Sequence, residues 1–220
     1  MPVYLGLDGF RWGWVAAEID DQGQQRFYYG PSLERLLSLP YQRAMIDIPI
    51  GLPVSGFRAC DEQARAKVKS SVFCGARRGI WDFKDMASAN KHYWRTEGEG
   101  KGISCQLWNL REKIRDADLF ITPKKQKKLR ETHPELVFWS LNGQRSLDSK
   151  KKEAGRKQRI AILKENGFKK VEQWLDLRFG TGIGRDDLID ACACAIAARD
   201  ATQRLGGDRD VRGLCMEIYY

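Results

Sequence analysis

The sequence has little of what a zinc site or a disulfide scaffold needs. It contains only two histidines, and none of its six cysteines forms a CxxC pair. A zinc site with the usual ligand spacing is therefore not expected. A chain this long can build a core without cross-links, so we expect the cysteines to be reduced, mostly buried and apolar in character. They are Cys60, Cys74, Cys105, Cys192, Cys194 and Cys215.

Long apolar runs are also missing. No stretch of 18 or more apolar residues occurs, so the sequence predicts no transmembrane helix and no membrane partner. The first eight residues have neither the basic region nor the long apolar region of a signal peptide. A cytoplasmic location is expected by default.

The composition is that of a folded globular protein. The 220 residues are 42% hydrophobic and 30% charged, which is enough for one domain over residues 1–220 with a sizeable core. The net charge is +9, and residues 124–170 alone carry a net +10. Such a local excess favours a polyanionic partner such as nucleic acid, the alternative being a solvated basic surface. The oligomeric state is left open, a homodimer included.

The N-terminal part predicts a βββαβ order. Three short runs rich in β-branched and aromatic residues are separated by polar breaks, which indicates an antiparallel meander. A short helix opening at Pro31 and a fourth strand that Pro49 stops follow it. This order is typical of the RNase H-like α/β fold, a mixed five-stranded sheet flanked by helices. The four strands are expected at residues 3–7, 12–19, 26–29 and 43–48.

The remainder predicts mainly helices. Three amphipathic helices would form an insertion over residues 54–120, after the fourth strand. The run Leu136–Trp139 predicts the fifth strand, and Gly206-Gly207 would end the last long helix. The expected helices are residues 60–69, 82–96, 107–116, 150–166 and 186–204, and residues 214–219 are expected to form a last strand or an extended tail.

Four aspartates are candidate metal ligands. Asp8 follows the first strand, and Asp47 lies in an apolar strand, where an unpaired carboxylate is costly. Asp187 and Asp190 are three residues apart and share one helix face, where their repulsion makes sense if a cation lies between them. Asp186 has a simpler explanation as the helix N-cap. The alternative for all of them is a structural role in turns and caps.

Together these carboxylates could converge at one end of the sheet. Hard oxygen ligands suit Mg²⁺ or Mn²⁺, and such ions support phosphodiester hydrolysis. The sequence therefore predicts a metal-dependent nuclease whose basic segment holds the phosphate backbone.

Six motifs in order resemble a known family over about residues 3–205. The chain is similar to the predicted RNase H-like nucleases named domain of unknown function 429. The motifs are Gly6–Val15, Asp47–Pro53, Arg58–Arg65 with Ser71–Phe73, His133-Pro134-Glu135, Lys151–Gly155 with Arg159, and Asp186–Ala191.

The resemblance implies roles for matching positions. Asp8 corresponds to the central metal ligand of RNase H-like nucleases, and Asp47 to the acid of the fourth strand. Asp187 and Asp190 match the Asp-x-x-Asp-Ala string of Holliday-junction resolvases. Glu135 would be a further acid and His133 a proton donor or water-positioning group, or the two would brace the fifth strand. The candidate substrate contacts are Arg11, Arg58, Arg65, Lys151, Lys152 and Arg159.

Two alternatives remain at this point. One is a binding module for nucleic acid or a protein partner without catalysis. The other is a phosphotransferase of the sugar-kinase and actin type, in which Gly6-Leu7-Asp8-Gly9 would cradle phosphate. That architecture needs two copies of the βββαβα unit, and the chain has one unless a homodimer supplies the other.

Overall fold

A computed structural model describes residues 1–220, apart from the side chain of Ser70. The chain forms two compact units. The first contains residues 1–48, 128–203 and 219–220, and the second contains residues 49–127 and 204–218. The predicted insertion, residues 54–120, falls within the second unit. Across the described chain, no helix combines the length and the apolar character that a bilayer crossing requires.

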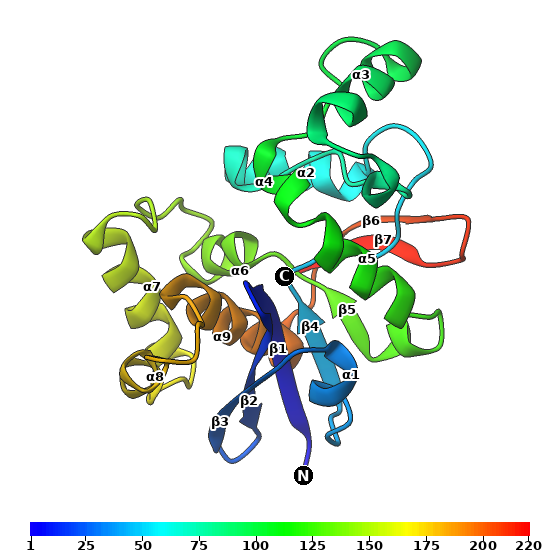
Figure 1. The fold of residues 1–220 in the computed structure, drawn as a ribbon. Helices are drawn as coiled ribbons and strands as arrows, with labels where there is room; N and C mark the ends of the chain where they lie inside the picture. The colour runs from blue at the N-terminus through cyan, green and yellow to red at the C-terminus, as the bar shows by residue number, and fades with distance from the viewer. The chain divides into compact units, whose positions relative to one another are not determined.

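The first unit is built on a five-stranded mixed sheet of order β3-β2-β1-β4-β5 (Figure 1). β1, β2 and β3 are antiparallel neighbours, while β4 pairs parallel with both β1 and β5. This is the mixed α/β sheet of an RNase H-like fold, as the sequence predicts. The strands are β1 (Val3–Phe10), β2 (Gly13–Asp20), β3 (Gln25–Gly30), β4 (Arg43–Ile46) and β5 (Leu129–Glu131).

One helix, α9 (Arg185–Asp200), packs against β1, β2 and β4. Its approach to β1 is close because Gly6 has no side chain: an added Cβ would overlap the backbone of Ala191 and Ala195. Helix α9 is buried from Leu188 through Ala198, which its many small residues allow. The other helices of this unit are α1 (Leu33–Leu36), α6 (Pro134–Leu141), α7 (Glu153–Glu165) and α8 (Val171–Leu177), of which the last three pack against α9.

Two sequence predictions about this unit are wrong. The run Leu136–Trp139 is not the fifth strand but part of helix α6, which Pro134 begins and His133 caps; β5 lies before it. Helix α9 ends at Asp200, and Gly206-Gly207 lies in a later strand instead of ending the helix. A fully apolar short run does not by itself distinguish a buried strand from a buried helix.

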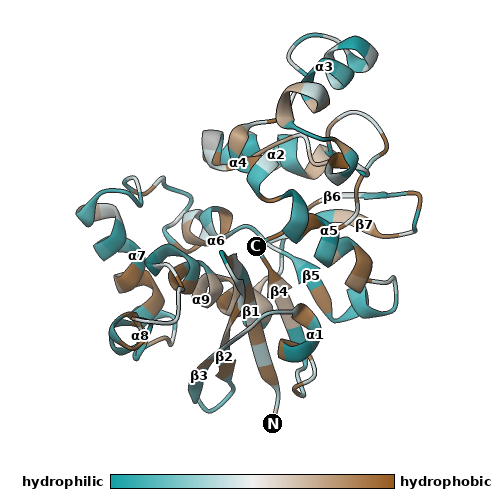
Figure 2. Cartoon of the chain, in the orientation of Figure 1, coloured by the Kyte–Doolittle hydropathy of each residue, from teal (hydrophilic) through white to brown (hydrophobic). Residues whose placement is uncertain are grey.

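The second unit is mostly helical and also holds a two-stranded sheet. Figure 2 shows mainly hydrophilic colouring along α3, in contrast to the apolar strands β2 and β4 of the first unit. Short 3₁₀ helices connect its elements at Lys69–Ser71, Ile80–Asp82 and Lys125–Lys127. The elements are α2 (Ala59–Val68), α3 (Met86–Glu97), α4 (Cys105–Asn109), α5 (Arg111–Phe120), β6 (Arg204–Arg209) and β7 (Cys215–Tyr219).

The six cysteines are all free thiols, as expected. Cys60, Cys192 and Cys194 are buried, whereas Cys105 is exposed and the other two are half-buried. The expectation of burial is therefore met by half of them.

Candidate metal centre

Asp8 lies inside β1, whereas the sequence predicts that it follows the strand. The strand continues because β1 pairs with β2 as far as Phe10 and Gly13, which places Asp8 opposite Val15. The Asp8 side chain is half-buried, and its Oδ1 accepts a hydrogen bond from the amide of Gly9 at 2.6 Å.

Asp47 is the first residue after β4. Its amide donates to the carbonyl of Leu7 at 3.0 Å, which continues the parallel pairing of β4 with β1. Asp47 is therefore next to Asp8 across two neighbouring strands, where the carboxyl end of β4 leaves room for a side chain.

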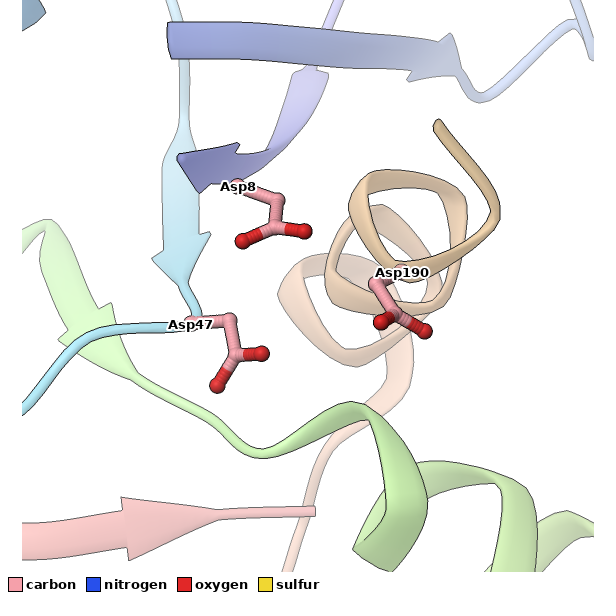
Figure 3. Close-up of side chains that lie close together, drawn as sticks. All are labelled: Asp8, Asp47 and Asp190. Atoms are coloured by element: carbon pink, nitrogen blue, oxygen red, sulfur yellow. The ribbon is translucent and has the colours of Figure 1, made fainter. Parts of the chain in front are cut away.

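Asp190 brings the third carboxylate from helix α9, and only 4% of the residue is exposed. One carboxylate oxygen from each of Asp8, Asp47 and Asp190 lies within 4.8 Å of the others. Figure 3 shows the three carboxylates around one common space, each from a different element. The close packing of α9 on Gly6, two residues before Asp8, sets the separation between helix and strand.

Asp187 is the fourth predicted ligand, but it is not among the three acids that meet. Its Oδ2 accepts a hydrogen bond from the amide of Gly184 at 2.8 Å, which caps the start of α9. Gly184 is the N-cap residue, so the sequence expectation that Asp186 has this role is wrong. Asp187 nevertheless lies close enough to Asp8 to raise the pKa of that carboxyl.

Lys150 is a site residue that the sequence analysis did not single out. Its Nζ lies 2.8 Å from Oδ2 of Asp190, and its charge also acts on Asp47 and Asp8. It is one of three consecutive lysines, so the sequence pattern suggests a solvated basic run. Nothing in the sequence distinguishes Lys150 from its neighbours, and it is far from all three aspartates along the chain.

A buried ion pair holds the loop that carries Lys150. Arg159 donates to both carboxylate oxygens of Glu135, at 3.0 and 2.8 Å, and to the carbonyl of Asp148 at 2.9 Å. Gly155 allows α7 to approach the same loop, because an added Cβ would overlap the carbonyl oxygen of Ser149. The Glu135–Arg159 pair thus braces the approach of Lys150 to the carboxylates.

His133 has a structural role that is visible directly. Its Nδ1 accepts a hydrogen bond from the amide of Glu135 at 3.3 Å, so it caps helix α6. Its charged form would also lower the pKa of Asp47, which places the ring near the cluster.

The three acids of the cluster lie close together, and the positive charge around them does not neutralise them all. Burial and the neighbouring carboxylates raise the pKa of Asp8 well above its ordinary value. Burial raises the pKa of Asp47 and that of Asp190, the latter to about 6, although Lys150 opposes both shifts. For Lys150, burial works against the charged form, but the surrounding carboxylates outweigh it and raise its pKa.

The donor set fits a hard divalent cation. Three carboxylates from separate elements provide oxygen ligands of the kind that Mg²⁺ and Mn²⁺ prefer. Oδ1 of Asp190 is buried and has no hydrogen-bond partner among the described residues. An unsatisfied buried carboxylate oxygen is costly, and a bound cation would satisfy it.

The predicted substrate contacts have different environments. Arg11, Lys151 and Lys152 are exposed in the first unit, and Arg65 is exposed on α2 of the second. Arg58 is buried and donates to Asp61 and to the carbonyl of Ile50. Arg159 is also buried, in the pair described above, so these two guanidinium groups are already engaged within the fold.

Comparison with known proteins gives one match. The family profile described as "Protein of unknown function (DUF429)" matches residues 6–210. No curated protein and no solved structure matches the chain.

Proposed function

Because the chain belongs to the DUF429 family and joins an RNase H-like sheet to three converging aspartates, we propose that it is a metal-dependent nuclease. Its reaction would be hydrolysis of a phosphodiester bond in nucleic acid. The observation that carries the proposal is the meeting of Asp8 from β1, Asp47 from the end of β4 and Asp190 from α9.

The three aspartates would hold Mg²⁺ or Mn²⁺. Bound there, the cation supplies Lewis-acid stabilisation of charge on phosphate oxygens and makes water a better nucleophile. The fold holds the ligands in place before substrate arrives: Gly6 fixes the position of α9 on β1, and the amide of Gly9 orients Asp8. Such preorganisation limits the rearrangement that the reaction requires.

Lys150 has two proposed roles in this site. In the absence of other cations its ammonium group neutralises part of the charge of Asp190 and Asp47. When a phosphate group is present, the same ammonium can donate hydrogen bonds to phosphate oxygens. Lys151 and Lys152 are exposed and extend this positive charge towards solvent. They would contact the phosphate backbone of the nucleic acid next to the bond that is cleaved.

The test is a cleavage assay with matched variants. Single-stranded, duplex and junction substrates of DNA and of RNA are incubated with the full-length chain and Mg²⁺ or Mn²⁺. We expect cleavage by the wild type that falls by at least about 100-fold in Asp8→Asn and Asp190→Asn, because each loses a ligand. The control is Asp176→Asn, an exposed acid on α8 whose loss should change nothing.

Two results would contradict the proposal. Equal cleavage by the wild type and Asp8→Asn would mean that the activity comes from another site. Tight binding of nucleic acid without cleavage of any substrate would instead favour the non-enzymatic binding module.

A further inference from the structure

An exposed tryptophan follows closely after Asp8 of the candidate metal centre in the chain. Trp12 lies in the turn between β1 and β2 and is 64% exposed, although the burial of an indole is normally favourable. It is four residues beyond Asp8 along the chain. Such a length of extended chain spans at most about 14 Å.

The indole is held in place from one edge. Gly182 lies against it: a Cβ on Gly182 would overlap the ring, and the nearest ring atoms are Cζ3, Cε3 and Cη2 on the benzo edge. Gly182 also has φ +81°, a conformation that favours glycine. Because the support comes from an edge and most of the residue stays exposed, a ring face remains available to a ligand.

The loop that supports Trp12 is closed by hydrogen bonds among its own residues. Arg178 donates to the carbonyl of Ile183, and Thr181 bonds to both Arg178 and Ile183. The loop then enters α9, which carries Asp190. Trp12 therefore follows the strand that carries Asp8 and lies against the loop that leads into the helix that carries Asp190.

Positive charge accompanies the aromatic surface. The guanidinium of Arg11 lies 5.5 Å from the centre of the Trp12 ring, and that of Arg178 lies 4.6 Å from the ring of Phe179, which is 69% exposed. Nε of Arg178 is buried without a hydrogen-bond partner among the residues that the structure describes. Aromatic faces with adjacent guanidinium groups suit a ligand that has both a flat ring and a negative charge.

We propose that Trp12 is a stacking platform for an unpaired base of a single-stranded nucleic acid. The proposal deepens the proposed function and rests on it: the same strand would continue to the carboxylates. A stacked strand rises about 3.4 Å per nucleotide, so at most about four nucleotides are needed between Trp12 and Asp8. Duplex substrates are disfavoured because their base faces are already covered by neighbouring bases, whereas an unpaired base exposes a face to the indole.

The test separates stacking from charge by changing the ligand as well as the protein. Binding is measured by fluorescence anisotropy in full-length Asp8→Asn, which prevents cleavage. One probe is a labelled thymidine 20-mer, and the other is an abasic oligonucleotide of equal length and charge. Trp12→Ala should weaken binding of the thymidine probe about tenfold and leave the abasic probe unchanged. Trp12→Phe, which keeps a ring face, should recover most of the loss.

Trp94→Ala is the matched control, since Trp94 is the other strongly exposed tryptophan at 50% and lies in the second unit. It should bind both probes as the parent does. Equal losses for both probes, no loss in Trp12→Ala, or the same loss in Trp94→Ala would overturn the platform while leaving the proposed nuclease standing. Failure of the Asp8→Asn parent to bind any nucleic acid would overturn both.

Discussion

Buried carboxylates occur in both units of the chain, but they are neutralised differently. In the second unit, Asp118 lies 2.8 Å from Arg78 and 2.9 Å from Arg212. Asp210 pairs with Arg78 and also accepts hydrogen bonds from the amides of Leu52 and Leu214. Each acid in this network pairs with at least one arginine, although Oδ1 of Asp118 is buried without a hydrogen-bond partner among the described residues.

In the first unit three acids share one lysine. Asp8, Asp47 and Asp190 meet within 4.8 Å, and the ion pair to Lys150 is made through Asp190. The contrast teaches that the acids of the second unit have arginine partners, whereas those of the first unit repel one another and would be stabilised by a bound cation. Groups of acids with raised pKa values are found more often at functional sites than elsewhere.

The largest effect is expected from breaking the network of the second unit. Asp210→Ala removes a carboxylate partner of Arg78 and the acceptor of three backbone amides, those of Leu52, Arg212 and Leu214, while Arg78 keeps its pair with Asp118. Because three amides lose their acceptor, at about 1–3 kcal/mol for each buried one, we expect a loss of about 3–5 kcal/mol in the free energy of unfolding, measured by urea denaturation. Asp208→Ala, an exposed acid on the same strand β6, is the control and should stay within about 0.5 kcal/mol. If Asp210→Ala changed the free energy of unfolding as little as Asp208→Ala, the two units would not differ in how their buried carboxylates affect stability.

The pH dependence of stability gives an effect of intermediate size. Burial raises the pKa of Asp190 to about 6, so the folded chain keeps a proton that the unfolded chain releases near pH 4. The folded state then binds more protons in this window, and its stability falls as the pH rises from about 4 to about 6. Asp8 and Asp47, whose pKa values are also raised, act in the same direction.

The measurement is urea unfolding in the presence of a chelator at several pH values. The contribution of Asp190 is at most about 3 kcal/mol. Asp8→Asn should be as stable as the wild type or more stable near pH 7, and its pH profile should be flatter. Adding a divalent cation should raise the free energy of unfolding of the wild type and leave that of Asp8→Asn unchanged. Parallel profiles for the two proteins would show that the cluster is not the source of the pH dependence.

The smallest effect concerns the lysine that the three acids share. Lys150→Met removes a positive charge next to Asp190, so we expect the affinity for Mn²⁺ to rise several-fold, about 1 kcal/mol, in calorimetric titration. The stability of the metal-free protein should fall, because the acids lose their counter-charge. Lys151→Met, an exposed neighbour, should alter neither quantity. An unchanged affinity in Lys150→Met would mean that Lys150 leaves the cluster without cost.

Much of the fold follows from local patterns in the sequence. The three hairpin-linked strands and the fourth strand are short apolar runs between polar breaks, and the structure confirms their order. Helix α6 was missed because Leu136–Trp139 is apolar on every side, as a buried strand would be. Helix α9 was predicted too long because Ala201–Gln203 lie between the helix and β6 without a strong stop signal.

The candidate site is predictable only in part. Asp8 and Asp47 could be paired because neighbouring parallel strands bring their carboxyl ends together. The choice between Asp187 and Asp190 depends on the rotation of α9 about its axis, which the packing on Gly6 sets and the sequence alone does not. The position of Lys150 at the cluster depends on a loop that Arg159 and Glu135 hold in place. That contact joins residues far apart in the sequence, and no local pattern predicts it.

Gly6 also bears on which ion the site would accept. Since α9 rests directly on the backbone of β1 at this residue, the distance between Asp8 and Asp190 cannot shrink further, and any larger residue would push the helix away. The smallest side chain in the strand therefore works as a spacer. In the proposed metal site, Gly6→Ala would therefore widen the space between the ligands and shift the preference from small cations towards larger ones such as Ca²⁺.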